Sequence, residues 1–405
     1  MKLLAISEHY FPRVGGTVNY VHETLCALAE QGVDIELIVP GPAPEEFLTN
    51  QTVLPYHLRW IDVGYPPKGD PSREQRYNFC MQTNAEICAR LHTSNQPDVV
   101  HVMFGLFVME VLETEKLQAA GVATFATVHN VPPMECRVTA HNAPLLVRFK
   151  EDARLFFVKA KNRTRLRRHA YCTYIVPSEQ VAGLLRPIVV TPVAVIGHGP
   201  TSDLQACLKP PASRLPQERT RILTVAGYAP HKRQHLIPQV AARLLELGVD
   251  FQWDVVGPSG RVTGYYDSIA SEVKLLQLDG KVTLHHAVPL ATLAQLYDNA
   301  NLYVQPSIEE GFCLTALDAA ATGLPVIGCP AGALPAITAA SGGQLVNSSA
   351  AQLADAISRF VRNRQWPDSA ELVETIRECF SWQAAAKSLL DQYIQHTHKI
   401  DDGAV

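Results

Sequence analysis

The sequence predicts an α/β protein built from two doubly wound domains, each a parallel sheet covered by helices on both faces. Short apolar runs such as LLAIS (3–7) and IELIV (35–39) alternate with segments of helical periodicity along the chain. Parallel strands joined by crossover helices give this alternation. It breaks once, in the proline-containing segment TSDLQACLKPPASRLPQERT (201–220), and then resumes, which indicates two domains and a linker.

The first predicted domain spans residues 1–200. After the strand at 3–7 comes a glycine loop, and then a helix at 17–32 whose apolar residues recur at helical spacing. Further strands are expected at 35–39, 99–103, 123–128, 174–177 and 193–197.

The second predicted domain spans residues 221–380 and repeats the pattern. Its apolar runs are ILTVAG, WDVVG, VTLHH, LYVQPS and PVIG. Ligands bind outside the carboxyl ends of the strands in such sheets. Two of these domains facing each other would therefore place two binding crevices across one cleft.

Composition is that of a well-packed globular protein, since 47% of the 405 residues are hydrophobic and 18% are charged. The net charge of −4 argues against a dedicated nucleic-acid binder. Nine cysteines without a CxxC spacing indicate free thiols in a reducing compartment and no zinc site. No run of about 18 apolar residues occurs, and the opening MKLLAISEHY meets charge too early for a signal peptide. We therefore expect a cytoplasmic protein.

The stretch PSIEEGFCLTALDAAATGLPV (306–326) places acids on both sides of a predicted helix start. The helix is expected to begin near Cys313 and to end at Gly323, because Pro325 prevents its continuation. The N–H groups at its start form an anion site suited to a phosphate. These donors are expected on Phe312, Cys313, Leu314 and Thr315.

Glu310 lies just before this helix start, and Asp318 lies about one turn inside it. One interpretation is a clamp for a sugar nucleotide, with sugar hydroxyls on Glu310, the diphosphate on the helix start and the ribose on Asp318. The alternative is structural: Glu310 stabilises the helix dipole by about 0.3–1 kcal/mol and Asp318 is a solvated helix residue. Spacing alone leaves both interpretations open.

A second stretch, VAGYAPHKRQHL (225–236), reads as a strand, a glycine and a short loop, followed by Lys232 and Arg233 at the head of a helix. A lysine at this place can reach a diphosphate that lies across the crevice. A Lys–Arg pair on a solvated helix face is the alternative.

These two stretches together resemble the retaining glycosyltransferases of family 4, which have the GT-B fold. That family carries two glutamates separated by seven residues in a PS-x-x-EGFG-like stretch; Glu310 matches the first, and Asp318 replaces the second. The resemblance extends over most of the chain. It includes EHYFPRVGGTVNYVHETLCALAEQGVDIELIV (8–39), VVHVM, TVHNVPP, IVPSEQV, VIGHG, VVGPSG and FSWQAAAKSLLDQYI.

The resemblance implies transfer of a sugar from a UDP- or GDP-linked donor to a glycan, lipid-linked or small-molecule acceptor, with retained anomeric configuration. It implies no metal and no cofactor besides the donor. By the match, Lys232 neutralises the leaving diphosphate with Arg233 beside it, Glu310 holds the transferred sugar, and Asp318 holds the ribose.

The resemblance also assigns roles in the first domain. Gly15 and Gly16 would let the first helix approach the donor, and His129 matches a position near the reacting sugar. A strand-end histidine is otherwise often structural. The closing helix, 381–398, would cross back to the first domain.

Four departures from the family pattern leave other functions open. Tyr228 stands where many members have arginine, Cys313 where they have glycine, Asp318 where they have glutamate, and Ala336 where glutamate often follows the proline. A sugar-nucleotide epimerase of the same fold is one alternative. A catalytically degenerate binding protein is another, and Tyr228 and Ala336 favour it.

The segment 148–168 is strongly basic and contains three consecutive apolar residues, Leu155, Phe156 and Phe157. It reads as a long helix with a solvated basic face. The sharper interpretation is peripheral contact with an anionic membrane at the inner face, or with an anionic acceptor. Nucleic acid is not expected, because no recognised binding motif accompanies the charge.

Overall fold

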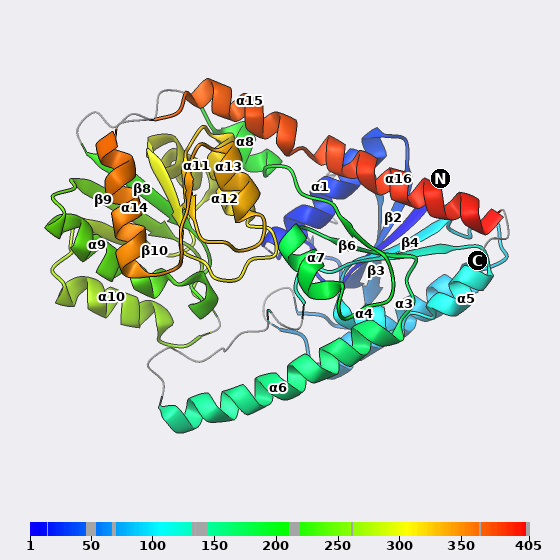
Figure 1. Ribbon diagram of the computed structural model, residues 1–405. Coiled ribbons are helices and arrows are strands. Elements are labelled where there is room, and N and C mark those ends of the chain that lie inside the picture. The colour runs from blue at the N-terminus through cyan, green and yellow to red at the C-terminus, as the bar shows by residue number, and fades with distance from the viewer. Residues whose placement is uncertain are drawn as a thin grey trace. The chain divides into compact units, whose positions relative to one another are not determined.

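The chain forms two compact units of α/β structure (Figure 1). Unit 1 contains Met1–Val131, Lys161–His198 and Trp382–Val405, and unit 2 contains Pro132–Ala160 and Gly199–Ser381. The predicted division near residue 200 therefore differs from the observed one for residues 132–160. The computed structural model describes residues 1–13, 15–45, 54–66, 70–131, 134, 144–209, 219–260, 262–363 and 366–401.

Unit 1 is built on a seven-stranded sheet in the order β3-β2-β1-β4-β5-β6-β7, and every pair is parallel. All the predicted strands of this half are present. The strands are β1 (Lys2–Ser7), β2 (Asp34–Gly41), β3 (His57–Asp62), β4 (Val99–Phe104), β5 (Ala123–Thr127), β6 (Thr173–Val176) and β7 (Val193–Val195).

Helices connect these strands. They are α1 (Gly16–Glu30), α3 (Arg73–Arg90), α4 (Leu106–Val111), α5 (Thr114–Ala119), α6 (Leu145–Arg168) and α7 (Glu179–Leu185). The first part of α6, up to Ala160, is grouped with unit 2, and the closing helix α16 (Trp382–Asp401) is grouped with unit 1. The first turn of α3 is fixed by a capping box between Ser72 and Gln75. The closing helix α16 packs on α1, so the last described residues of the chain belong to unit 1.

Unit 2 has a six-stranded parallel sheet in the order β10-β9-β8-β11-β12-β13. Its strands are β8 (Thr220–Val225), β9 (Phe251–Val256), β10 (Val282–His285), β11 (Leu302–Gln305), β12 (Val326–Gly328) and β13 (Gln344–Leu345). Its α-helices are α8 (Ser202–Cys207), α9 (Ile237–Glu246), α10 (Tyr265–Leu275), α11 (Leu290–Asn299), α12 (Leu314–Ala321), α13 (Leu334–Ala340), α14 (Ala350–Asn363) and α15 (Ser369–Cys379), with 3₁₀ turns η2 (Pro230–Lys232) and η3 (Gln234–Leu236).

Two parallel α/β sheets confirm the predicted fold class. The segment predicted as a linker contains α8, and its residues 210–218 lie outside the described part of the chain. No helix among the described residues is long and apolar enough to span a membrane.

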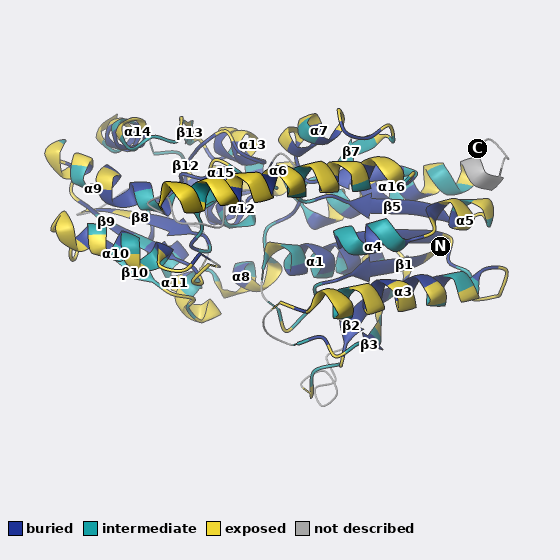
Figure 2. Cartoon of the chain, turned by 90° about the horizontal axis from the view of Figure 1, so that it is seen from below, coloured by how far each residue is buried: buried dark blue, intermediate teal, exposed yellow. Residues whose placement is uncertain are grey.

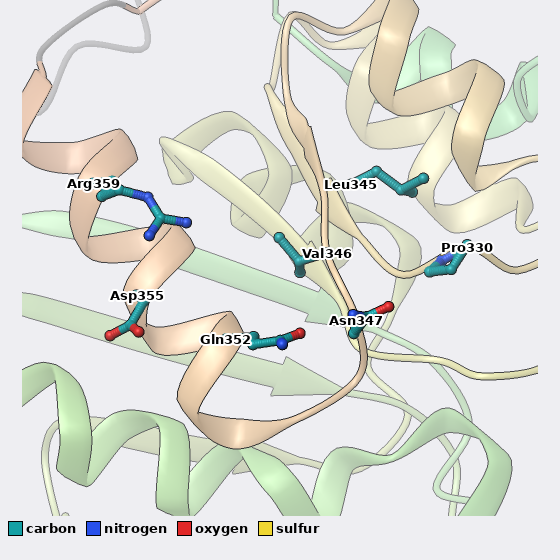
Figure 3. A pocket seen from close by; sticks show the side chains of 7 residues that line it. All are labelled: Pro330, Leu345, Val346, Asn347, Gln352, Asp355 and Arg359. Atoms are coloured by element: carbon teal, nitrogen blue, oxygen red, sulfur yellow. The ribbon is translucent and has the colours of Figure 1, made fainter.

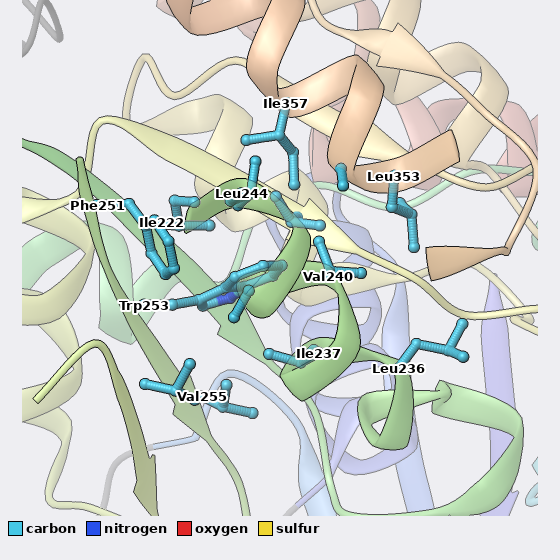
Figure 4. Close-up of a cluster of buried hydrophobic side chains, with 14 of the residues drawn as sticks. Ile222, Leu236, Ile237, Val240, Leu244, Phe251, Trp253, Val255, Leu353 and Ile357 are labelled. Carbon is cyan, nitrogen blue, oxygen red and sulfur yellow. The ribbon is translucent and has the colours of Figure 1, made fainter. Parts of the chain in front are cut away.

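Buried apolar residues of the strands and helices pack against the sheet of unit 2. Buried stretches of the chain are dark blue in Figure 2. On one face, α9 and α14 close over Trp253, whose indole N–H donates to Thr224 Oγ1 at 3.1 Å (Figure 4). Because β8 lies between β9 and β11, the loops after β8 and β11 leave the same edge of the sheet side by side. The two stretches singled out in the sequence are these two loops.

Candidate active site

The helix predicted after the acids is α12, and its bounds agree with the sequence pattern. Cys313 precedes the helix with φ of 88°, and Gly323 follows it with φ of 81°. Both angles favour glycine. The family usually has glycine at the position of Cys313. The positive φ of this position explains that preference, although this chain has cysteine there.

The start of α12 leaves backbone amides without acceptors inside the helix. The amides of Ala316 and Leu317 both donate to the Cys313 carbonyl at 3.2 Å. The preceding amides of Leu314 and Thr315 have no acceptor within the helix, which is the general property of a helix N-terminus. Two tyrosines fix the geometry here: Tyr303 donates to Thr315 Oγ1 and Tyr297 donates to the Thr315 carbonyl.

Lys232 and Glu310 meet in an ion pair with Nζ and Oε2 2.6 Å apart. Lys232 ends η2 in the loop after β8, whereas Glu310 lies in the loop after β11. A backbone hydrogen bond from Ile308 N to His231 O, 3.0 Å long, ties the two loops together. Two residues predicted from separate stretches therefore belong to one site in unit 2.

Glu310 is buried, with only 5% of its side chain exposed, and the pair makes this burial tolerable. Gln305 Nε2 also donates to Oε1 at 3.2 Å. Burial alone raises the pKa of Glu310, but the Lys232 ammonium and a hydrogen bond from Ser307 outweigh it, and the pKa lies below its usual value. Glu310 is therefore an ionised carboxylate at neutral pH.

Gly332, in the loop after β12, was missed by the sequence reasoning although it fixes the position of Glu310. Its φ is 58°, and a Cβ built on it would lie 2.7 Å from the Cβ of Glu310 and 2.9 Å from its carbonyl oxygen. Only glycine permits this close approach. The carbonyl of buried Phe312 accepts from Ala333 N at 3.0 Å, which joins the same two loops again.

Arg233 lies next to Lys232 but is turned by a left-handed backbone, with φ of 59°. Its guanidinium donates to the Ser348 carbonyl at 3.1 Å. In turn, Ser348 Oγ donates to the Pro306 carbonyl at 2.7 Å. Arg233 therefore anchors the loop after β13 to the loop that carries Glu310, and its contact with a donor stays a prediction.

Tyr228, where the family often has arginine, is fully buried. Its hydroxyl donates to the carbonyls of Val255 and His285, at 3.0 and 3.1 Å, and so joins the ends of β9 and β10. At this position the chain therefore has a buried packing residue instead of the family's arginine. Lys232 is the cation that pairs with Glu310.

Asp318 is buried in α12, so it is not a solvated helix residue. Its two oxygens accept hydrogen bonds from the backbone N–H of Thr201, at 2.7 Å, and from its hydroxyl, at 3.1 Å. Thr201 immediately precedes α8, so Asp318 holds the start of α8 against α12. The contact expected between Asp318 and the ribose stays a prediction. In the structure, Asp318 has a structural role through its hydrogen bonds with Thr201.

Replacing Asp318 by asparagine is expected to lower the free energy of unfolding by about 1–3 kcal/mol, because the partly buried donors of Thr201 lose their charged acceptor. Urea unfolding measures this loss, with the less buried Asp298→Asn as the control. Donor KM is measured on the same samples. A higher donor KM with unchanged stability would assign Asp318 to the ribose and contradict the structural role.

His129 lies in unit 1, where its Nε2 is 3.2 Å from the Met103 carbonyl. This contact places the proton on Nε2. Burial lowers its pKa to about 4, so the ring is neutral at pH 7. It packs edge-on against Tyr20 of α1, at 4.7 Å between ring centroids, and lies near His198. Sequence reasoning missed this aromatic cluster, because its members come from distant segments.

Gly15 and Gly16 form the start of α1 as predicted. The φ of Gly15 is 156°, a conformation that favours glycine, and its carbonyl accepts from the amides of Val18 and Asn19. No described residue contacts the position that a Cβ on Gly15 would take. Their approach to a donor stays a prediction.

Unit 1 contains a cavity of about 310 Å³ at the start of α3 and beside α4 and α6. The Arg165 guanidinium lies over the Phe107 ring, 4.8 Å from its centroid, and pairs with Glu110 at 2.7 Å. Since α4 follows β4 directly, the cavity lies at the carboxyl edge of the sheet. Its lining comprises Arg73, Tyr77, Cys80, Phe107, Glu110, Val111, Lys161 and Arg165.

A cavity of about 400 Å³ in unit 2 lies between one face of α14 and the segment after β13 (Figure 3). It contains none of the predicted site residues. Among the described residues, no three His, Cys, Asp or Glu side chains are grouped to hold a metal ion.

Two family models match the chain. The one described as Glycosyltransferase Family 4 matches residues 14–201, and the one described as Glycosyl transferases group 1 matches residues 208–378. Together they cover most of the sequence.

Similar proteins include two D-inositol 3-phosphate glycosyltransferases. The one from Streptomyces griseus subsp. griseus is 30% identical over 193 residues, which is 44% of this chain and 40% of that protein. The one from Corynebacterium efficiens is 27% identical over an alignment that covers 100% of this chain and 98% of that protein. In the Streptomyces griseus relative and four further D-inositol 3-phosphate glycosyltransferases, the chain spans less than half of the relative, 40–46% of its length.

Solved structures share the fold over nearly the whole chain. Sucrose-phosphate synthase from Thermosynechococcus elongatus has a TM-score of 0.72 at 23% identity and covers 97% of this chain and 98% of its own. Anabaena HepE in complex with UDP-glucose has a TM-score of 0.68 at 14% identity, covering 98% of this chain and 100% of its own. These identities bear on the fold alone, which is that of GT-B glycosyltransferases.

Proposed function

We propose, from the premise that this chain belongs to the family 4 glycosyltransferases, that it transfers a sugar from a nucleotide-diphosphate sugar with retention of anomeric configuration. The observation that carries the proposal is the Lys232–Glu310 pair beside the start of α12. It combines a cation, a buried ionised carboxylate and helix-start amides at the carboxyl edge of one parallel sheet. Such a combination suits a diphosphate that leaves from a sugar.

Lys232 is proposed to neutralise the charge that develops on the leaving diphosphate. An ammonium group has three donors, so it can keep Glu310 and still bind a phosphate oxygen. Glu310 has two oxygens and is proposed to accept hydrogen bonds from the transferred sugar. The pair therefore places opposite charges on the two sides of the bond that breaks.

The activity is tested by release of the nucleoside diphosphate from a panel of UDP- and GDP-linked sugars. We expect one donor to be consumed, and the rate to be unchanged in EDTA, because Lys232 and the α12 amides supply the positive charge. Binding of a nucleotide sugar without hydrolysis or transfer would instead favour a binding protein. Complete loss of rate in EDTA, restored by manganese, would contradict the proposed role of Lys232.

The acceptor is proposed to be a phosphorylated polyol, bound in the cavity of unit 1. Arg73, Lys161 and Arg165 provide three cations there, and Glu110 the one acid, with Tyr77 and Phe107 as apolar walls. The relatives from Streptomyces and Corynebacterium are named for an inositol phosphate acceptor. A free phosphorylated polyol and a lipid with a phosphorylated polyol headgroup share this chemistry, so either could be the acceptor.

Replacing Arg73 by alanine is expected to raise the KM for the acceptor about tenfold or more while leaving donor hydrolysis unchanged, because a charge-assisted phosphate contact is lost. Inositol phosphate, phosphatidylinositol vesicles and unphosphorylated inositol are compared as acceptors, with Arg186→Ala as the control for an exposed arginine of unit 1. Equal use of inositol with and without phosphate would overturn the acceptor proposal and leave the donor proposal standing.

A further inference from the structure

Helix α6 has two faces of different character. One face is covered by the rest of the chain and contains Glu151, Leu155, Asn162 and Leu166, which are buried. They are spaced by four, seven and four residues, which places them on one side of a helix. The other face is coloured as exposed along most of the helix in Figure 2.

The exposed face carries large apolar side chains in its first half. Phe149, Phe156 and Phe157 are 71%, 69% and 71% exposed, and no other phenylalanine in the described part of the chain is in the exposed class. Leu145 and Leu146 are 80% and 66% exposed. Leu145, Phe149 and Phe156 follow one another at helical spacing, so they form a continuous apolar stripe.

Charge on the same helix is strongly one-sided. Against nine lysine and arginine residues it has two acids, Glu151 and Asp152, in a chain whose net charge is −4. Glu151 is already bound by Arg154 through two hydrogen bonds, of 3.0 and 2.6 Å. The cations Lys150, Arg163 and Arg168 are exposed and lie beside or beyond the apolar stripe.

We propose that this exposed face of α6 docks the protein on a bilayer that carries anionic lipids. Phenylalanines at the surface of a basic helix suit the boundary between headgroups and acyl chains, and lysines and arginines suit the anionic headgroups around them. A second copy of the helix is disfavoured because it would bring a further excess of positive charge against the first. Nucleic acid would pair with the cations but would leave the phenylalanine stripe in water.

The apolar stripe and the cavity-lining residues of α6 lie on different sides of the helix. The last two turns of α6 turn Lys161 and Arg165 toward the cavity of unit 1, while the stripe occupies the other side of its first half. One helix would therefore hold the protein at a surface and line a binding cavity. The docking does not depend on the proposed sugar transfer, since it is measured without donor or acceptor.

The test is co-sedimentation of the full chain with vesicles of phosphatidylcholine alone, or with about a third of the lipid replaced by phosphatidylserine, whose headgroup is anionic but is no phosphorylated polyol acceptor. We expect binding only to the anionic vesicles, with affinity that falls as salt rises. The triple variant Phe149→Ser, Phe156→Ser, Phe157→Ser is expected to lose about tenfold or more of this affinity. The matched control is Val190→Ser with Leu275→Ser, which removes exposed apolar side chains outside α6 and outside the unit 1 cavity.

A charge variant, Lys150→Gln with Arg163→Gln and Arg168→Gln, separates the two contributions. It is expected to remove most of the salt dependence while thermal unfolding stays as in the wild type, because these side chains are exposed. Equal sedimentation with neutral and anionic vesicles, or wild-type binding by the phenylalanine variant, would overturn the proposal. Concentration-dependent dimerisation that the phenylalanine variant abolishes would also overturn it and assign the face to a second copy.

Discussion

Replacing Lys232 by alanine is expected to lower kcat/KM for the donor by about 10²- to 10³-fold. Loss of one preorganised charge at a developing anion has this magnitude in other enzymes. In this protein the ion pair is expected to increase the loss of kcat/KM. Without Lys232, the negative charge of Glu310 would repel the leaving diphosphate. Initial rates at varied donor concentration measure the effect.

Folding is the confounding factor for this variant, and the structure allows it to be separated. Removing one partner of a buried pair costs roughly 3–5 kcal/mol, and we expect less here because 22% of the Lys232 side chain is exposed. Urea unfolding of the same sample gives the stability loss. Lys232→Arg restores a cation and should recover stability more than activity. The planar guanidinium of arginine cannot reproduce the contacts of the compact lysine ammonium.

Lys281 provides the matched control. It pairs with Asp250 at 2.8 Å, also in unit 2, but that pair is partly exposed and lies at the opposite, amino-terminal end of the strands. Lys281→Ala is expected to leave kcat/KM within a factor of about two, as for other surface ion pairs. Wild-type turnover by Lys232→Ala, with this control unchanged, would remove Lys232 from the site.

Replacing Glu310 by glutamine is expected to lower kcat by about 10²-fold or more and to leave the donor KM unchanged or lower. The substitution keeps the shape of the side chain but removes the negative charge beside the sugar, where positive charge develops in the transition state. At the same time it releases the Lys232 ammonium from its partner 2.6 Å away, which favours contact with the diphosphate. The opposite signs of these two effects make the result specific.

The neighbouring Glu309→Gln removes a charge of the same type from the same loop and serves as the control. Steady-state kinetics with varied donor distinguishes the outcomes. A rise in donor KM with kcat unchanged would mean that Glu310 contributes uniform binding only. The proposed position beside the reacting sugar would then be wrong.

Acid stability gives an independent check on Glu310. Its pKa in the folded protein lies below the value of an unfolded glutamate, so its contribution is present above the unfolded pKa, about 4.3, and is lost as the pH falls through the folded value. In Glu310→Gln, the free energy of unfolding should therefore fall less steeply with pH below about pH 4.3 than in the wild type. Urea unfolding at a series of pH values measures this difference.

Much of the fold was predictable because most strands are buried on both faces and read as apolar runs. Strand β3 was missed, since it lies at the sheet edge and alternates exposed with less exposed residues. β13 has two residues, which is too short for a pattern. The grouping of residues up to Ala160 with unit 2 was not foreseen either, because the described part of this segment is the first part of α6, and a helical pattern does not say which sheet the helix joins.

The candidate site was predictable in its parts but not in its contacts. Spacing and resemblance singled out Lys232 and Glu310 separately, whereas their pairing follows from the adjacency of β8 and β11, which no local pattern reports. Gly332 likewise acts through a close approach to Glu310 from another loop. Asp318 was expected to face a ligand, and its contact with Thr201, 117 residues away, is tertiary.

The central claim, transfer with retention, is tested most directly by the anomeric configuration of the product. The donor identified in the release assay is incubated with the preferred acceptor, and the first-formed glycoside is examined by proton nuclear magnetic resonance before it can change. We predict that the product carries the same anomeric configuration as the donor. A product of inverted configuration, or an epimerised nucleotide sugar with no glycoside, would contradict the account.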